Sequence, residues 1–132
     1  MKTFDRFLPR SRNLTVLEIG GAPGRYLVYM SKNLNYKIHA LDYSVIGCKK
    51  TLENFKLLGL EGNVYQKDLF LDDISSLPRF DIVYSLGFIE HFANLETVIE
   101  KHALWNNCFI CCSYLLFLSL FRSCVYAFMS ML

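Results

Sequence analysis

The sequence has no cluster of basic residues. Its 132 residues include 14 Lys and Arg against 12 Asp and Glu, a formal net charge of +2, and only 20% of the residues are charged. No run of five or more Lys or Arg occurs. A surface that binds nucleic acid without regard to sequence needs a concentration of positive charge. The composition therefore predicts no nucleic-acid partner.

The sequence also lacks the features of a secreted protein. The N-terminus has no charged segment followed by an apolar run, so no signal peptide is predicted. The five cysteines are an odd number and four of them fall within residues 108–124, which does not suit a disulfide framework. We expect reduced thiols in an intracellular, cytoplasmic protein. The grouping Cys108-x-x-Cys111-Cys112 has no second pair of ligands, so no metal site is predicted.

Hydrophobic residues make up 53% of the chain, and 132 residues suit a single domain. Their distribution is uneven: residues 1–101 mix charged and apolar side chains, whereas residues 108–132 are nearly all apolar or small, with Arg122 as their only charge. The composition divides the chain into a lead-in over residues 1–13, a core over residues 14–104, and an apolar, cysteine-rich tail over residues 105–132.

Within the core, short apolar runs alternate with longer amphipathic stretches. This rhythm is typical of parallel strands, whose crossover connections cover both faces of a sheet. It predicts an α/β fold with a Rossmann-like, doubly wound, mostly parallel sheet. The predicted strands are residues 15–19, 36–41, 63–66 and 80–85, and the predicted helices are residues 25–33, 45–58 and 95–102.

The pattern also predicts where several side chains lie. His39 lies within the second predicted strand, so we interpret it as a packed sheet residue. In the last predicted helix, the spacing of Leu95, Val98 and Ile99 indicates an inward face. His102 ends that helix, where a positive charge would suit the helix dipole.

The segment Thr15–Met30, TVLEIGGAPGRYLVYM, has the form of a strand, a glycine turn and a helix. Ligands of doubly wound sheets bind beyond the carboxyl ends of the strands, where the first such turn lies. Gly20 and Gly24 lack a Cβ atom, so the chain can turn sharply and approach a ligand closely. The turn has neither the Gly-Lys-Ser/Thr ending of a P-loop nor the G-x-G-x-x-G of a dinucleotide fold. Its pattern is E-x-G-x-x-x-G.

Two acidic residues follow later strands. Asp42 comes 18 positions after Gly24, close to where a carboxylate meets a ribose in Rossmann-type sites. The alternative is a helix-capping or loop aspartate. Asp68 follows the third strand at the same edge of the sheet, and it is either a ligand-binding residue or a solvated loop residue.

Four stretches in this order and spacing, LEIGGAPG, ALDYS, KDLF and FDIVYSLGFIEHF, resemble the successive motifs of class I S-adenosylmethionine-dependent methyltransferases. The last is most similar to small-molecule methyltransferases of the ubiquinone/menaquinone-biosynthesis type. The resemblance covers about residues 14–102. It implies S-adenosylmethionine as cofactor, S-adenosylhomocysteine as its product, and a small-molecule methyl acceptor as the partner.

The resemblance also implies roles for matching residues. Glu18 and Gly20 would contact the methionine moiety, Asp42 would hold the ribose hydroxyls, and Tyr43 would flank the adenine. Asp68, with the backbone amide of the next residue, would read the adenine edge. The full set of implied cofactor-binding residues is Glu18, Gly20, Gly21, Gly24, Asp42, Tyr43, Asp68, Leu69 and Ser85.

Residues 85–88 would lie near the sulfonium methyl. Methyl transfer from a sulfonium is an in-line displacement, which needs alignment and exclusion of water more than covalent help. If the acceptor must lose a proton, His91 is the best-placed base. The alternative is that Glu90 and His91 only cap or orient the following helix.

The tail departs from the family pattern, which has seven strands where this sequence predicts four or five. Residues 109–116 could form a fifth strand. Residues 108–132 could instead form a membrane anchor, since about 20 apolar residues span a bilayer, although Arg122 opposes this. We favour a third interpretation, a truncated product. The alternative function is then a non-catalytic isoform that binds the cofactor, or a protein partner or membrane through residues 105–132.

Overall fold

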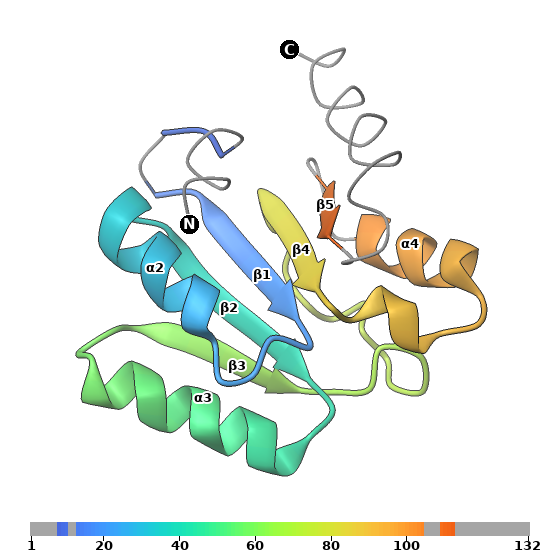
Figure 1. The fold of residues 1–132 in the computed structure, drawn as a ribbon, viewed down its shortest axis with the longest axis horizontal. Coiled ribbons are helices and arrows are strands. Elements are labelled where there is room, and N and C mark those ends of the chain that lie inside the picture. Colours follow the sequence, from blue (N-terminus) through green and yellow to red (C-terminus); the bar gives the residue numbers. More distant parts are fainter. Residues whose placement is uncertain (1–7, 11–12, 105–108, 113–132) are drawn as a thin grey trace.

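The computed structural model describes residues 8–10, 13–104 and 109–112. Five parallel strands form one sheet in the order β3-β2-β1-β4-β5 (Figure 1). The predicted Rossmann-like parallel sheet is therefore confirmed. The strands are β1 (Thr15–Ile19), β2 (Lys37–Asp42), β3 (Gly62–Gln66), β4 (Ile82–Leu86) and β5 (Phe109–Cys112). The helices are α2 (Arg25–Leu34), α3 (Val45–Leu57) and α4 (Leu95–Ala103), with a short 3-10 turn, η1 (Ile89–His91).

The strand order reverses at β1. The chain runs outward from β1 to β2 and β3, and then returns to place β4 on the other side of β1. The connections that leave the carboxyl ends of β1 and β4 therefore go in opposite directions. In sheets of this kind, such a switch point leaves a crevice where ligands bind.

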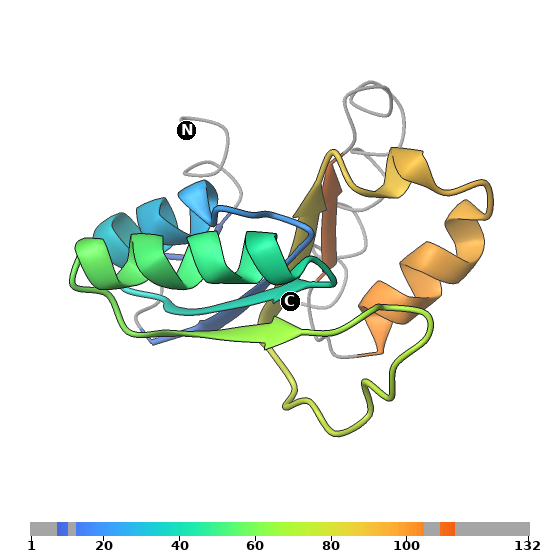
Figure 2. The ribbon, with the colours of Figure 1, turned by 90° about the horizontal axis from the view of Figure 1, so that it is seen from below.

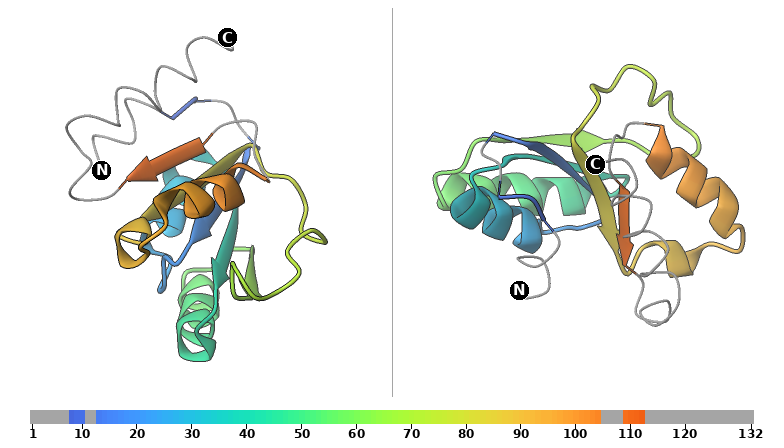
Figure 3. Two further views of the ribbon diagram at one scale, coloured as in Figure 1. Left: turned by 90° about the vertical axis from the view of Figure 1, so that its right-hand side faces the viewer. Right: turned by 90° about the horizontal axis from the view of Figure 1, so that it is seen from above.

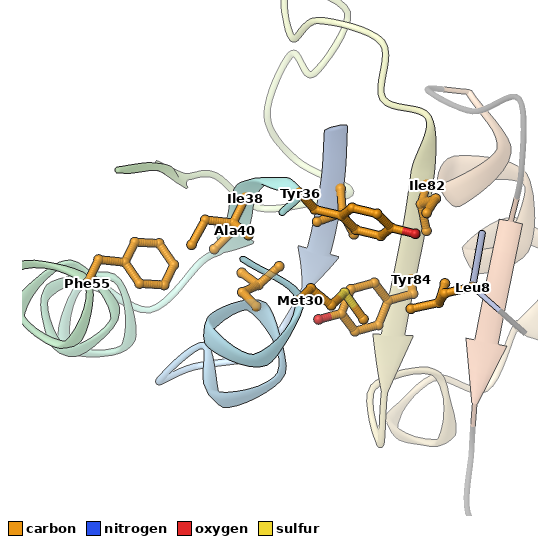
Figure 4. Packing of buried hydrophobic residues seen from close by; sticks show 10 residues of the cluster. Leu8, Met30, Tyr36, Ile38, Ala40, Phe55, Ile82 and Tyr84 are labelled. Carbon is orange, nitrogen blue, oxygen red and sulfur yellow. The ribbon is translucent and has the colours of Figure 1, made fainter. Parts of the chain in front are cut away.

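The two faces of the sheet are covered differently. Helices α2 and α3 lie on one face, whereas α4 and the connection between β3 and β4, residues 67–81, lie on the other (Figures 2 and 3). On the helix face, Met30 and Phe55 pack against strand residues such as Ile38 and Tyr84 (Figure 4). Parallel strands buried on both faces need nearly continuous apolar sequence, which accounts for the short apolar runs.

The opposite face has its own core. Leu17 and Ile19 of β1 point to this side, whereas Val16 points to the helix side, as the alternation of a strand requires. Residues 67–81 contain turns but no helix, and they cover the face with side chains from the connection. The buried members of this core are Leu17, Ile19, Leu41, Leu69, Ile74, Phe80 and Val83.

Helix α3 begins where the sequence predicts. Ser44 is its N-cap, and the Ser44 side chain accepts a hydrogen bond from the Gly47 amide at 3.1 Å. Such a cap satisfies one of the free N–H groups of the first turn. Just after the helix, Gly59 has a φ of 64°, a left-handed conformation that favours glycine.

The inward face of α4 differs from the prediction. Val98 is buried as expected, but Leu95 and Ile99 are 39% and 38% exposed. The second buried residue is His102, which lies one turn after Val98 on the same side of the helix. Burial lowers the pKa of His102, so it is not the cation at the end of the helix that the sequence suggested.

His39 is a packed sheet residue, as predicted. Its ring lies parallel to that of Tyr65, with ring centres 6.1 Å apart, and 4.9 Å from the ring of Phe80. Nδ1 lies 3.4 Å from Asn63 Nδ2, an amide that can only donate, so Nδ1 accepts. Burial lowers the pKa of His39.

Strand β5 coincides with the first part of the strand predicted at residues 109–116, and it pairs in parallel with β4. Residues 105–108 and 113–132 lie outside the described residues, so the interpretations of the tail as a membrane anchor or a truncated end stay predictions. In the described part of the chain, no helix combines the length and apolar character needed to cross a bilayer.

Candidate functional site

A cavity of about 460 Å³ lies at the carboxyl edge of β1, β2, β3 and β4. This volume is within the range of about 300–1,000 Å³ that is common for small-molecule sites. Six residues singled out by the sequence line it, namely Gly20, Asp42, Tyr43, Asp68, Leu69 and His91. The rest of the lining consists of Ile19, Leu41, Lys67, Phe70, Gly87, Phe88 and Phe92.

The turn after β1 has a conformation that requires glycine. Gly20 has a φ of 68°, and its amide donates to the Leu41 carbonyl at 2.8 Å. A Cβ atom on Gly20 would lie 2.4 Å from Cδ2 of Phe88. Gly24 has a φ of 77° at the start of α2. The sharp turn expected from the sequence is present, and its backbone is held against β2 at the cavity floor.

Glu18 lies beneath this turn, with only 1% of its surface exposed. A Cβ atom on Gly21 would lie 2.0 Å from the carboxyl carbon of Glu18, so that the glycine leaves room for this side chain. Oε2 of Glu18 has no hydrogen-bond partner among the described residues. Burial raises the pKa of Glu18 from 4.5 to about 8, and the nearby Tyr84 hydroxyl partly opposes the rise. An uncompensated buried carboxylate is costly, so this arrangement suits a ligand that brings a donor or a positive charge.

Asp42 ends β2 at the cavity wall. Its Oδ1 atom accepts a hydrogen bond from the Ser44 amide at 2.9 Å, which fixes the carboxylate in place. The cap of α3 is Ser44, not Asp42, so Asp42 is not the helix-capping residue of the alternative interpretation. Tyr43, which follows, is 71% exposed and lines the cavity.

Asp68 both lines the cavity and shapes the loop after β3. Its Oδ1 atom accepts from the amides of Phe70 and Leu71, at 2.8 and 3.1 Å. The Asp68 amide in turn donates to Oδ2 of Asp72 at 2.7 Å. Leu69 is anchored by its buried side chain. These bonds hold the Leu69 backbone and the Phe70 ring at the rim.

Four of the singled-out residues are not part of the cavity lining, namely Glu18, Gly21, Gly24 and Ser85. Ser85 is fully buried, and its Oγ atom lies 3.1 Å from Nε2 of His102 in α4. Nδ1 of His102 lies 2.7 Å from the Val98 carbonyl and must be the protonated nitrogen that donates there. Because the ring is neutral, Nε2 accepts from the Ser85 hydroxyl. The pair fastens β4 to α4 behind the cavity.

The sequence reasoning missed most of the aromatic lining. The ring of Phe92 lies 4.9 Å from that of Phe70 and 4.9 Å from that of Phe88. Phe88 lies within residues 85–88, which were expected near the sulfonium methyl. Phe70 and Phe92 were not singled out, although they stand in the stretches KDLF and FDIVYSLGFIEHF. Lys67 was missed as well; it lines the cavity and its Nζ donates to the Asp73 carbonyl at 2.9 Å.

A family model described as a methyltransferase domain matches residues 1–105 of this chain. The chain belongs to the methyltransferase domain family. Ribosomal RNA small subunit methyltransferase C of Aliivibrio salmonicida is 32% identical to this methyltransferase domain in an alignment 94 residues long that covers 65% of this chain and 26% of that protein. The chain therefore spans about a quarter of the curated relative.

Solved structures of methyltransferases share the fold of this domain. Coclaurine N-methyltransferase bound to N-methylheliamine and S-adenosylhomocysteine (SAH) aligns with a TM-score of 0.72 at 17% identity, over 83% of this chain and 33% of that one. A SAM-dependent methyltransferase from Aquifex aeolicus aligns with a TM-score of 0.63 at 23% identity, over 76% and 54%. The plantazolicin methyltransferase BpumL in complex with SAH aligns with a TM-score of 0.66 at 16% identity, over 84% and 42%.

Proposed function

We propose that this methyltransferase domain binds S-adenosylmethionine at the carboxyl edge of the sheet and transfers its methyl group to a small-molecule acceptor. The observation that carries the proposal is the single cavity that brings together the glycine turn and the acidic residues after β2 and β3. Structural relatives that have been solved with SAH bound support the choice of cofactor.

The residues present fit this cofactor chemically. Glu18 offers a buried oxygen without a partner beside Gly20 and Gly21, where the positively charged methionine end would lie. Asp42 offers a fixed carboxylate to two ribose hydroxyls. Asp68 and the Leu69 backbone offer an acceptor and an amide to the edge of a base. The glycines leave the floor of the cavity open, because a Cβ atom on Gly20 would collide with its neighbour.

When bound, the cofactor supplies an electrophilic methyl group on a sulfonium. The chain contributes orientation and exclusion of water, which can provide most of the rate in a displacement of this kind. Gly87 and Phe88 form the wall beside the glycine turn. His91, on the exposed rim of the cavity, is the candidate to accept a proton from the acceptor.

Calorimetric titration of the full chain with S-adenosylmethionine and SAH tests the proposal, with NAD and ATP as comparison ligands. We expect heat with the first two only. Asp42→Asn should weaken SAH binding by about tenfold, which corresponds to about 1.4 kcal/mol for one lost charged contact. Glu61→Gln is the matched control, because Glu61 is an exposed acid just before β3, at the opposite edge of the sheet.

A folded, monodisperse sample that gives no heat with either ligand would refute the proposed cofactor. SAH binding without methyl transfer to any of a panel of small hydroxyl and amine compounds would favour the non-catalytic alternative. Mass spectrometry of the panel after incubation with S-adenosylmethionine detects transfer as a gain of one methyl group per acceptor.

A further inference from the structure

The cavity is divided into a charged part and an aromatic part. Its charged side chains lie at the carboxyl ends of two strands: Asp42 ends β2, and Lys67 and Asp68 follow β3. The connection after β4 contributes Gly87, Phe88, His91 and Phe92. This second part has no formal charge when His91 is neutral. The charged part of the cavity therefore suits a nucleoside, and the aromatic part suits a less polar molecule.

The aromatic part is one continuous cluster of Phe70, Phe88 and Phe92, here called the phenylalanine cluster. The ring of Phe92 lies between the other two, 4.9 Å from each, at interplanar angles of 49° and 50°. Tilted pairs at this separation are energetically favourable, and they present both ring faces and ring edges to a neighbour. All three side chains are only half-buried, so part of each ring faces the cavity.

The phenylalanine cluster begins at the glycine turn. Cδ2 of Phe88 is the nearest side-chain atom to the position of a Cβ atom on Gly20, at 2.4 Å. The cluster therefore runs from the floor of the proposed cofactor site across the wall after β4. A second small molecule held against these rings would lie next to the ligand on the glycine turn.

The charges of the lining disfavour an anionic second ligand. Two carboxylates, Asp42 and Asp68, face the cavity against a single Lys67, whose Nζ already donates to the Asp73 carbonyl. A negatively charged group would lose its hydration among phenyl rings without gaining a positive partner. A phosphate-rich acceptor such as RNA fits this wall poorly, although one relative is named as a ribosomal RNA methyltransferase.

We infer that the phenylalanine cluster is the acceptor subsite and that it takes an uncharged, flat aromatic molecule bearing a hydroxyl or amino group. This inference rests on the proposed function. In the reaction, a lone pair of the acceptor oxygen or nitrogen bonds to the methyl carbon of the sulfonium cofactor while the sulfur–methyl bond breaks. The bonding pair stays on sulfur as a neutral thioether, and the acceptor proton leaves to water or to His91.

Binding of 2-naphthol to the full chain saturated with SAH tests this inference, with 2-decalol as a saturated analogue and 2-naphthoate as a charged one. We expect 2-naphthol to bind more tightly than both. Phe92→Leu keeps an apolar side chain but removes the central ring. It should weaken 2-naphthol binding by about two- to tenfold, the range expected for lost aromatic contacts, and leave the Kd of SAH within about twofold.

Leu71→Ala is the matched control, because Leu71 is 86% exposed beside Phe70 and is not part of the cavity lining. It should change neither affinity. If Phe92→Leu fails to fold, judged by circular dichroism, Phe70→Leu replaces it at the edge of the same cluster.

Three results with 2-naphthol and its charged analogue would overturn the acceptor subsite: 2-naphthoate binding as tightly as 2-naphthol, leucine variants that bind 2-naphthol like the parent chain, or displacement of SAH by 2-naphthol. The last would place the rings in the cofactor site. A short single-stranded RNA that binds in place of 2-naphthol would also overturn it. Absence of SAH binding to the parent chain would refute the proposed function and the acceptor role together.

Discussion

Replacement of Glu18 by Gln should remove the loss of stability that burial of this carboxyl group causes between about pH 4.5 and pH 8. Burial raises the pKa of Glu18 in the folded chain from 4.5 to about 8. Below pH 4.5 the carboxyl group is protonated in both the folded and the unfolded chain. As the pH rises above 4.5, the unfolded chain releases this proton and the folded chain retains it, so the free energy of unfolding falls until about pH 8.

The magnitude follows from the same two values. Each pH unit in the window lowers the free energy of unfolding by about 1.4 kcal/mol, so the full window costs about 5 kcal/mol. This is a large share of the roughly 5–15 kcal/mol that stabilise a typical domain. His39 and His102 have lowered pKa values and act in the other direction, because they destabilise the fold as the pH falls below 6.5. The difference between the parent chain and Glu18→Gln cancels their effect.

Urea denaturation at half-unit steps from pH 5 to pH 9 measures this difference. The two curves should lie within about 1 kcal/mol at pH 5, where a protonated carboxyl and an amide are alike in charge. They should diverge steadily up to pH 8, with the variant more stable. Parallel curves throughout would refute the assignment of a buried, uncompensated carboxyl group to Glu18.

The same substitution tests the ligand side of the site. A positively charged group placed beside Glu18 would lower its pKa, so SAH binding near pH 7 should release a fraction of a proton. Calorimetry in buffers with different ionisation enthalpies counts that proton. Glu18→Gln should abolish the release, and a release of equal size in the variant would show that another group supplies it.

Three further substitutions probe neighbouring parts of the site. Gly20→Ala should lower the free energy of unfolding by at least about 1–2 kcal/mol, since φ is 68° and a Cβ atom would lie 2.4 Å from Phe88, and should weaken SAH binding by more than tenfold. Asp42→Asn should leave the thermal midpoint within about 3 °C while reducing SAH affinity by about tenfold. Ser85→Ala should cost about 1–2 kcal/mol in urea denaturation, because His102 loses a buried hydrogen bond, with little change in SAH affinity.

For each substitution, one result would contradict the role given to the residue. Gly20→Ala that binds SAH normally would show that the turn does not approach the ligand. A large drop in the thermal midpoint of Asp42→Asn would make its role structural. Loss of SAH binding in Ser85→Ala, at unchanged stability, would place that hydroxyl in contact with the ligand and contradict the position seen behind the cavity wall.

The strands were predictable because burial on both faces leaves a strong pattern. Strand β1 has the bounds that the sequence predicts, β2 is shifted by one residue at both ends, and β3 begins one residue earlier than predicted. β4 begins two residues later than predicted. Asp81, within the predicted range, uses its carboxylate to accept from the backbone and hydroxyl of Thr15, both at 2.8 Å, instead of extending the strand. Hydrogen bonds between residues so far apart in the sequence cannot be predicted from the local pattern of apolar residues.

The site was predictable where a backbone conformation or a strand end demands a residue type. Gly20 and Asp42 follow from such rules, and both line the cavity. The phenylalanine cluster could not be read in the same way, because Phe70 and Phe92 are 22 positions apart and meet only through the fold. Ser85 shows the reverse: its position in a motif suggested the cavity, but strand alternation turns it toward α4.

The uneven cover of the sheet has a consequence for the motion of one cavity wall. Residues 67–81 cover the part of one sheet face beside α4 with turns and a few anchoring side chains, without the cooperative hydrogen bonding of a helix. Such a segment opens at a lower free energy than the sheet beneath it, so its amides should exchange with solvent by local excursions while those of β1 exchange only on global unfolding. Because this segment carries Asp68 and Phe70, we expect this wall of the cavity to open locally more often than the sheet does, which hydrogen exchange of the Asp68 and Phe70 amides would measure.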